Sequence, residues 1–391
     1  MSTPDVVVVG GGIGGLSTAY ALACTGQRVR VLEQAERFGE VGAGLQLAPN
    51  ATRVLRRWGL LDQVTAAGVL PRRLVFKDAL DGVELTSLYL DTGFVDRYQA
   101  PYVLVHRSDL HAILVQACHE AGVELLAASR ADDVVLDSGG ATVLTEDGEH
   151  RADVVVAADG LWSTLRRTVS DDEPVCSGYV AYRGARPLAE VREHVDPDSL
   201  HDVVVYIGPD CHLVQYSLRH GEIHNTVAVF ASPAYRRGES DWGTPAELDA
   251  AFAPACEQVQ RGLQALWRDR RWPMYDRLPI DTWTHGRFVL TGDAAHPMLQ
   301  YFAQGACQAM EDAHSLATHV AKGLAGGTLD WPAVLAAYQH ERVPRTARVQ
   351  TNVRTWGDIW HCDGLTRTLR NALLLDRRLD DYRHIDWLYQ A

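Results

Sequence analysis

The sequence of 391 residues contains almost no lysine, and its net charge is −13. Lys77 and Lys322 are its two lysines, and arginine pairs such as Arg72-Arg73 stand among acidic residues. A protein that binds nucleic acid through its phosphates needs a dense positive surface. We therefore expect no nucleic-acid partner.

Cysteine is present without any pattern. The seven cysteines include no Cys-x-x-Cys pair, which is typical of reduced thiols in a cytoplasmic protein rather than of a disulfide framework. No apolar run reaches the ~18 residues that a membrane helix needs, and a buried strand is predicted where a signal peptide would stand. We expect a cytoplasmic protein without a transmembrane segment. The motif Gly-x-Ser-x-Gly of serine hydrolases is also absent.

A dinucleotide-binding fingerprint occurs once, near the N-terminus. The apolar run Val6–Val9 predicts a buried parallel strand. Gly10, Gly12 and Gly15 follow it at the spacing G-x-G-x-x-G, which permits a tight turn, close approach of the backbone to a pyrophosphate, and close helix–strand packing. Glu33 ends the next predicted strand, where a carboxylate accepts hydrogen bonds from a ribose. By itself this unit does not decide between FAD and NAD.

The middle of the chain has a different pattern of predicted secondary structure. Strands predicted at 203–207, 211–218 and 223–230 are separated by glycine and polar turns, which indicates an antiparallel sheet. Long helices are predicted at 252–267 and 306–322.

Four more motifs decide the cofactor. They are the segment 42–51 with Gly44, the pair His106-Arg107, Asp159-Gly160 after an apolar run, and Gly292-Asp293 after another. Their order resembles that of the single-component FAD-dependent aromatic hydroxylases, and the resemblance covers nearly the whole chain. It implies bound FAD, with NADH as a transient co-substrate and O2 as the oxidant.

The resemblance also implies roles around the cofactor. Asp293 would accept hydrogen bonds from the ribityl chain, Asp159 would steady the pyrophosphate region, and Arg107 would reach the flavin side of the groove. Gly305 and Ala306 open a predicted helix whose positive N-terminal end would face the flavin. Asp293 and His296 could instead form a metal pair, but a third ligand at metal spacing is lacking, so we expect no metal.

Segments 208–216, 272–277 and 294–301 resemble the members that hydroxylate 3-hydroxybenzoate. This implies that His212 takes the phenolic proton while Gln300 and Tyr216 fix the ring, so that 2,5-dihydroxybenzoate forms through a flavin C4a-hydroperoxide. Many relatives carry proline in place of Gln300. Cys307 stands where many relatives have the second glycine of a G-x-G pattern, and we expect it to be a small buried residue. A lone histidine on a strand is more often structural, and tyrosine there is ordinary.

The fold predicted on this basis is α/β. A Rossmann-like FAD-binding domain with a parallel sheet would comprise 1–72, 99–175 and 280–345; an inserted, mostly antiparallel substrate domain would comprise 73–98 and 176–279; a helical segment would span 346–391. We expect a small phenolic acid as substrate and a homodimer as the assembly. The alternatives are a salicylate hydroxylase, an FAD-dependent oxidase and a nicotinamide-dependent dehydrogenase.

Overall fold

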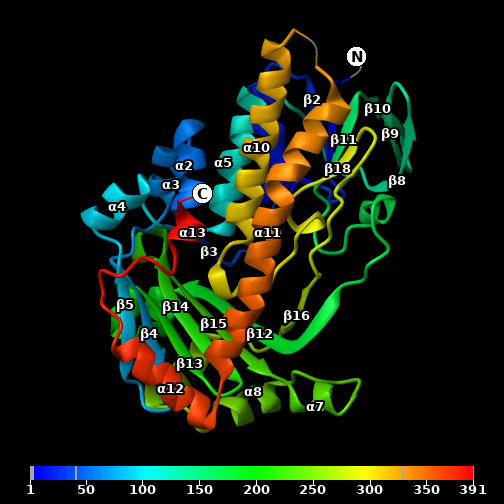
Figure 1. The fold of residues 1–391 in the computed structure, drawn as a ribbon. Coiled ribbons are helices and arrows are strands. Elements are labelled where there is room, and N and C mark those ends of the chain that lie inside the picture. Colours follow the sequence, from blue (N-terminus) through cyan, green and yellow to red (C-terminus); the bar gives the residue numbers. More distant parts are fainter. Residues whose placement is uncertain (1–3, 40–41, 328, 391) are drawn as a thin grey trace.

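The computed structural model describes residues 4–39, 42–327 and 329–390. The domains predicted from the sequence also include residues 1–3, 40–41, 328 and 391, which lie outside the described residues. Two large sheets, one above the other in Figure 1, are joined by long helices that run along the molecule. A mixed α/β fold is therefore confirmed.

The upper sheet has six strands in the order β17-β18-β11-β1-β2-β7. Its neighbours are parallel except for β17, which is antiparallel to β18. Four consecutive valines in β1 are completely or almost completely buried, because strands flank them on both sides and helices cover the faces. The strands are β1 Val6–Val9, β2 Val29–Leu32, β7 Glu124–Leu126, β11 Val154–Ala157, β17 Thr284–His285 and β18 Phe288–Leu290.

Helix α1 packs on β1 and β2, α5 packs on β7, α10 packs on α1, and α11 lies along α10 (Figure 1). They span α1 Ile13–Ala23, α5 Arg107–Glu120, α10 Gly305–Ala325 and α11 Trp331–His361. Shorter elements surround them: α2 Pro49–Arg57, α3 Leu61–Ala67, α4 Thr92–Tyr98, the strand pair β3 Gly44–Leu47 and β6 Val103–His106, and the small sheet β8 Ala131–Asp137, β9 Gly140–Thr145 and β10 Gly148–Ala152.

The lower sheet has seven strands in the order β16-β12-β15-β14-β13-β4-β5. All neighbouring pairs are antiparallel except β13 with β4. One face packs on α8 Pro245–Phe252 and α9 Glu257–Gly262, and the other face turns toward the first sheet. The strands are β4 Arg73–Asp78, β5 Glu84–Tyr89, β12 Val175–Pro187, β13 Val203–Gly208, β14 Cys211–Leu218, β15 Ile223–Ala231 and β16 Trp272–Asp276.

The single helix expected at 252–267 is wrong, because α8 ends at Phe252 and α9 begins only at Glu257. Pro254 lies between them and has no backbone N–H to continue a helix. The domain boundaries remain a prediction, and α11 runs continuously through residue 345.

The C-terminal part is helical, with α12 Gly364–Leu375 and α13 Asp386–Tyr389 after α11. None of the helices in the described part of the chain is long and apolar enough to cross a membrane. The short helix α6 Leu188–Val191 contacts β12 and β15 of the lower sheet, and the short helix α7 Pro233–Arg236 follows β15 in the chain.

Candidate active site

A cavity of about 1030 Å³ lies between the two sheets. Its wall combines the start of α1, the start of α10, the inner face of the lower sheet and the C-terminal residues up to Tyr389. Among the residues predicted for the site, those that line it are Gly12, Gly44, Arg107, His212, Tyr216, Asp293, Gln300, Gly305 and Ala306. Gly10, Gly15, Glu33 and Asp159 are not part of this wall.

The first glycines are packed too tightly to be replaced. A Cβ on Gly15 would lie 1.9 Å from the carbonyl oxygen of Gly10, and one on Gly10 would lie 2.3 Å from that of Ala158. Gly10 also has a φ of +109°, a conformation that favours glycine. Gly12 is the N-cap of α1 and has no side chain to cap it, so the helix terminus opens on the cavity. Such a terminus suits a phosphate group.

The carboxylate of Glu33 accepts hydrogen bonds from the backbone of the glycine turn and from the backbone of Ala35. Its Oε2 accepts the backbone N–H of Gly11 at 2.7 Å, and its Oε1 accepts that of Ala35 at 2.8 Å. Each carboxylate oxygen has a further lone pair, so both can still accept ribose hydroxyls. The geometry fits the adenosine end of a dinucleotide.

Asp159 faces the backbone of the loop that follows it. Its Oδ2 accepts the N–H groups of Thr164 at 3.1 Å and Leu165 at 3.4 Å, while its Oδ1 is buried without a partner. Desolvation by burial raises the pKa of this carboxyl. Gly160, next in the chain, does line the cavity, so Asp159 shapes a loop that borders it.

Asp293 lies in the loop that follows β18 and lines the cavity. A Cβ on Gly305 would be 3.8 Å from its Oδ1, so the carboxylate lies beside the first turn of α10. Its side chain is solvent-accessible, yet surrounding protein desolvates it and raises its pKa, while His296 and Arg107 act to lower it. The N-cap of α10, Gln304, makes no side-chain cap hydrogen bond. These groups can accept and donate hydrogen bonds along an extended polar ligand.

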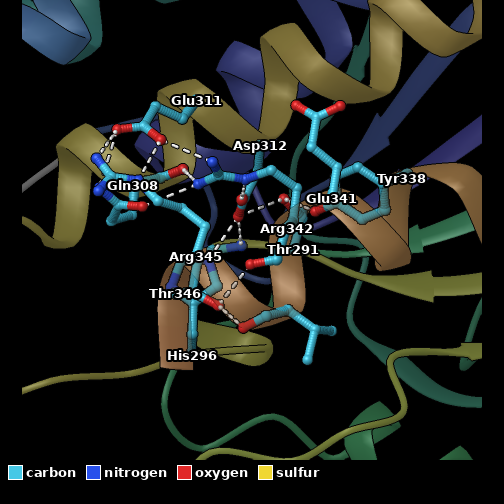
Figure 2. A network of polar contacts seen from close by, with 12 residues as sticks. Thr291, His296, Gln308, Glu311, Asp312, Tyr338, Glu341, Arg342, Arg345 and Thr346 are labelled. Carbon is cyan, nitrogen blue, oxygen red and sulfur yellow. Dashed lines mark hydrogen bonds and ion pairs between the residues drawn. The ribbon is translucent and has the colours of Figure 1, made fainter. Parts of the chain in front are cut away.

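A buried ionic network fixes the loop that carries Asp293. Asp312 of α10 accepts the backbone N–H of Gly292 at 3.0 Å and contacts His296 at 2.5 Å. Arg342 of α11 bridges Asp312 at 2.8 Å and Glu311 at 2.6 Å, as Figure 2 shows. Because every carboxylate here meets a guanidinium or an imidazole, the loop is held without an unpaired charge.

His212 and Tyr216 point from one face of β14 into the cavity, as their spacing predicts. Tyr216 packs against Gly44, where a Cβ would lie 2.4 Å from the phenolic oxygen. This contact gives Gly44 a steric reason to be glycine. Desolvation raises the pKa of Tyr216, so its hydroxyl stays a hydrogen-bond donor.

His212 is completely buried, and its two ring nitrogens differ. Nδ1 lies 2.8 Å from Nε2 of His361, the last residue of α11, and the two rings stack at 5.1 Å. Nε2 is buried and has no partner among the described residues. Desolvation, and then His361, lower the pKa of His212 well below its usual value. At neutral pH the imidazole is therefore uncharged, and its Nε2 is a hydrogen-bond acceptor when Nδ1 carries the proton.

Gln300 lies close to a residue that the sequence does not single out. Nη2 of Arg183, on β12, is 3.4 Å from Oε1 of Gln300, and Arg183 also lines the cavity. Cys307 is buried, and burial raises the pKa of its thiol to about 12, in keeping with a small apolar residue. Arg183 and His361 were missed because both reach the site through contacts distant in sequence.

The chain is similar to known flavoproteins along nearly its whole length. Residues 3–353 match the family model described as an FAD binding domain. The chain is 38% identical over 389 residues to a 3-hydroxybenzoate 6-hydroxylase of Polaromonas naphthalenivorans (strain CJ2), which covers 98% of this chain and 95% of that protein.

Two solved structures share the fold. HpxO of Klebsiella pneumoniae, complexed with FAD and uric acid, has a TM-score of 0.84 and 26% identity, covering 98% of this chain and 95% of HpxO. A salicylate hydroxylase substrate complex has a TM-score of 0.81 and 26% identity, covering 100% and 96%. The chain therefore belongs to the family of FAD-dependent aromatic monooxygenases.

Proposed function

We propose that this enzyme hydroxylates 3-hydroxybenzoate para to its hydroxyl group and releases 2,5-dihydroxybenzoate. One substrate molecule, O2, NADH and a proton would give the product, water and NAD⁺. The observation that carries the proposal is His212, an uncharged buried imidazole that lines the cavity and whose Nε2 has no partner among the described residues. The 38% identity to an enzyme of that name supports the choice of substrate.

FAD would be held along the cavity by residues from four parts of the chain. The turn at Gly10, Gly12 and Gly15 would receive the pyrophosphate, and Glu33 the adenosine ribose. Arg107, Asp293 and the start of α10 at Gly305 and Ala306 would hold the flavin half, and Asp159 would support the loop next to the pyrophosphate. When bound and reduced by NADH, FAD supplies the activated oxygen.

His212 would take the phenolic proton at Nε2. For this the tautomer must carry its proton on Nδ1, which then donates to Nε2 of His361 at 2.8 Å. His361 stacks on Tyr179 at 4.6 Å and is slightly exposed, so the pair leads from a sealed site toward solvent. A deprotonated phenol concentrates electron density on its ortho and para carbons, which prepares the ring for attack on an electrophilic oxygen.

Position, rather than charge, would choose among those carbons. Tyr216 of β14 and Gln300, in the segment after Asp293, would border the ring, and the wall also contains many valine, leucine and aromatic side chains. The apolar part of this wall would keep water from the reacting carbon. A misplacement of ~1 Å can cost ~10²-fold in rate, so these contacts would set the para selectivity.

The proposal is tested by substrate-stimulated NADH oxidation over a panel of hydroxybenzoates, with the products identified by chromatography. We expect 2,5-dihydroxybenzoate as sole product from 3-hydroxybenzoate, and a yellow protein that releases FAD rather than FMN on denaturation. Formation of 2,3- or 3,4-dihydroxybenzoate would contradict the positional assignment. A colourless protein that FAD does not reconstitute would contradict the cofactor site.

A salicylate hydroxylase is the second candidate, because the structure of such an enzyme with substrate shares the fold over the whole chain. It would release CO2 and form catechol from salicylate. A faster reaction with salicylate than with 3-hydroxybenzoate would favour it.

We further propose that the enzyme works in the cytoplasm as a homodimer. The scattered free cysteines support a reducing compartment. Leu365, Leu369 and Leu373 form an exposed apolar strip at four-residue spacing along α12, which a second copy could cover. Light scattering of the FAD-loaded protein at micromolar concentration tests the dimer.

A further inference from the structure

One face of the lower sheet forms a continuous wall of the cavity. The register aligns Arg183 of β12 with Val227 of β15, and Val227 with Val214 of β14. Val214 in turn lies opposite Val205 of β13. All four residues line the cavity. Among the strand residues that the structure places on this wall, Arg183 alone carries a permanent charge.

Arg183 is half-buried and differs from the fully buried arginines in its partners. Arg166 and Arg277 pair with Asp172, Arg342 with Asp312 and Glu311, and Arg370 with Asp78. Arg183 has no carboxylate within 4.0 Å in the described part of the chain. Its Nε is buried without a partner, and its one hydrogen bond to a side chain is the 3.4 Å contact with Gln300.

A buried cation without a counter-ion is costly, since desolvation favours its neutral form. Burial lowers the pKa of Arg183, and the nearby Arg107 lowers it further, while Tyr216 opposes this. Trp272 lies under the guanidinium at 5.6 Å and offers only its ring face. The protein therefore provides no anion to pair with the guanidinium of Arg183, and a negatively charged ligand could fill that role.

We propose that Arg183 is the residue that recognises the carboxylate of the aromatic acid substrate. This proposal rests on the proposed function and adds to it the residue that would select substrates with a carboxylate. A guanidinium presents its N–H groups in a planar fork that matches a carboxylate. Gln300, next to Arg183, can donate its side-chain amide to the same carboxylate.

The spacing of the sheet suits this assignment. Arg183 lies two strands away from His212 and two residues further along, so their Cα atoms are roughly 12 Å apart. Both side chains line the cavity, and we expect one benzene ring to fit between them. A ring with its hydroxyl at His212 Nε2 and its carboxylate at Arg183 would be anchored at two points, which fixes its rotation in the cavity.

The experiment compares an acid with its neutral isostere. FAD-loaded protein is titrated with 3-hydroxybenzoate and with 3-hydroxybenzamide, and binding is followed by calorimetry. We expect Arg183→Gln to weaken acid binding about ten- to a hundredfold and to change amide binding less than about threefold. Arg183→Lys should retain part of the preference, because the charge stays and the fork is lost. Arg186→Gln, on the same strand but paired with Glu190, is the control and should change neither affinity.

A second measurement uses the unaltered enzyme. Benzoate should displace bound 3-hydroxybenzamide, and benzamide should do so at least tenfold less well. Equal loss of acid and amide binding in Arg183→Gln, or loss of FAD, would overturn the inference, because Arg183 would then serve the fold or the flavin. An equal effect of benzoate and benzamide would also overturn it.

The two proposals fail in different ways. Tight acid-selective binding without hydroxylation would overturn the reaction and support the carboxylate site. Formation of 2,5-dihydroxybenzoate with an unchanged acid preference in Arg183→Gln would overturn the carboxylate site and support the reaction. Failure of the unaltered enzyme to bind any aromatic carboxylate would overturn both.

Discussion

Two buried polar regions of the protein differ in whether their polar groups have partners. At the interface of α10 and α11, Arg342, Asp312 and Glu311 satisfy one another with contacts of 2.6 to 2.8 Å. On the cavity wall, Nε2 of His212 and Nε of Arg183 have no partner in the described residues. The satisfied region holds the fold, and the unsatisfied one has hydrogen-bonding capacity left for a ligand.

The largest effect expected is in the unsatisfied region. His212→Ala should slow hydroxylation ~10²–10⁴-fold, because it removes the general base, and should leave FAD bound. More of the consumed NADH should then appear as hydrogen peroxide instead of product. Product and peroxide are quantified side by side, with the exposed His220→Ala as control. Near-normal turnover with full coupling in His212→Ala would show that this histidine is structural.

The satisfied region should respond in stability instead. Arg342→Met removes the guanidinium that two buried carboxylates share, so that Asp312 keeps only His296 and Glu311 keeps only Arg345 as a charged partner. Loss of one partner of a buried ion pair costs up to about 3–5 kcal/mol of unfolding free energy. Arg183→Met removes a cation that has no carboxylate partner and should leave stability equal or higher. Urea unfolding of both variants tests the contrast. Equal destabilisation by the two substitutions would remove the distinction between the regions.

Gln300 lies on the border of the unsatisfied region. Gln300→Pro deletes the side-chain amide near Arg183, and we expect up to ~10²-fold slower reaction or a mixture of dihydroxybenzoates. Product ratios by chromatography give the answer. Unchanged rate and selectivity would mean that Gln300 does not orient the ring.

A substitution at Glu33 tests the part of the site that is expected to bind the adenosine ribose of FAD. Glu33→Arg replaces an acceptor of ribose hydroxyls with a donor and also releases the N–H groups of Gly11 and Ala35. We expect FAD affinity to fall about ten- to a hundredfold, as measured by equilibrium titration of the apoprotein. Retained affinity would remove Glu33 from the site.

The smallest effect per residue is a pH dependence of stability. Desolvation lowers the pKa of His212 well below its usual value, that of His224 to about 4 and that of His361 to about 3. The unfolded chain therefore binds more protons below pH ~6.5, so stability is fully present above that pH and falls as the pH drops toward the folded values. Each histidine contributes a slope of up to about 1.4 kcal/mol per pH unit.

Urea unfolding at pH 7.5, 6.5 and 5.5 measures this slope, and His361→Leu should make it shallower. A stability that is level from pH 7.5 to 5.5 would contradict the prediction.

The sequence predicts those parts of the site that rest on local pattern. The glycine turn, Glu33 and the shared face of His212 and Tyr216 follow from spacing within one element. Arg183 reaches the cavity only through the register of three strands, and His361 contacts a residue 149 positions away. Such long-range pairing leaves no periodicity in the sequence. The helix predicted at 252–267 failed for the opposite reason, since apolar spacing outweighed Pro254.

The wall of the cavity also has a consequence for how the enzyme is made. Gly12 and Tyr389 both line it, and Arg345 binds the carbonyl oxygens of Trp387 and Leu388. A chain emerging from the ribosome folds its N-terminal parts first, so the nucleotide turn can form long before the wall is complete. Tight capture of the cofactor must then await synthesis of residue 389. A nascent chain stalled before that point should bind FAD weakly.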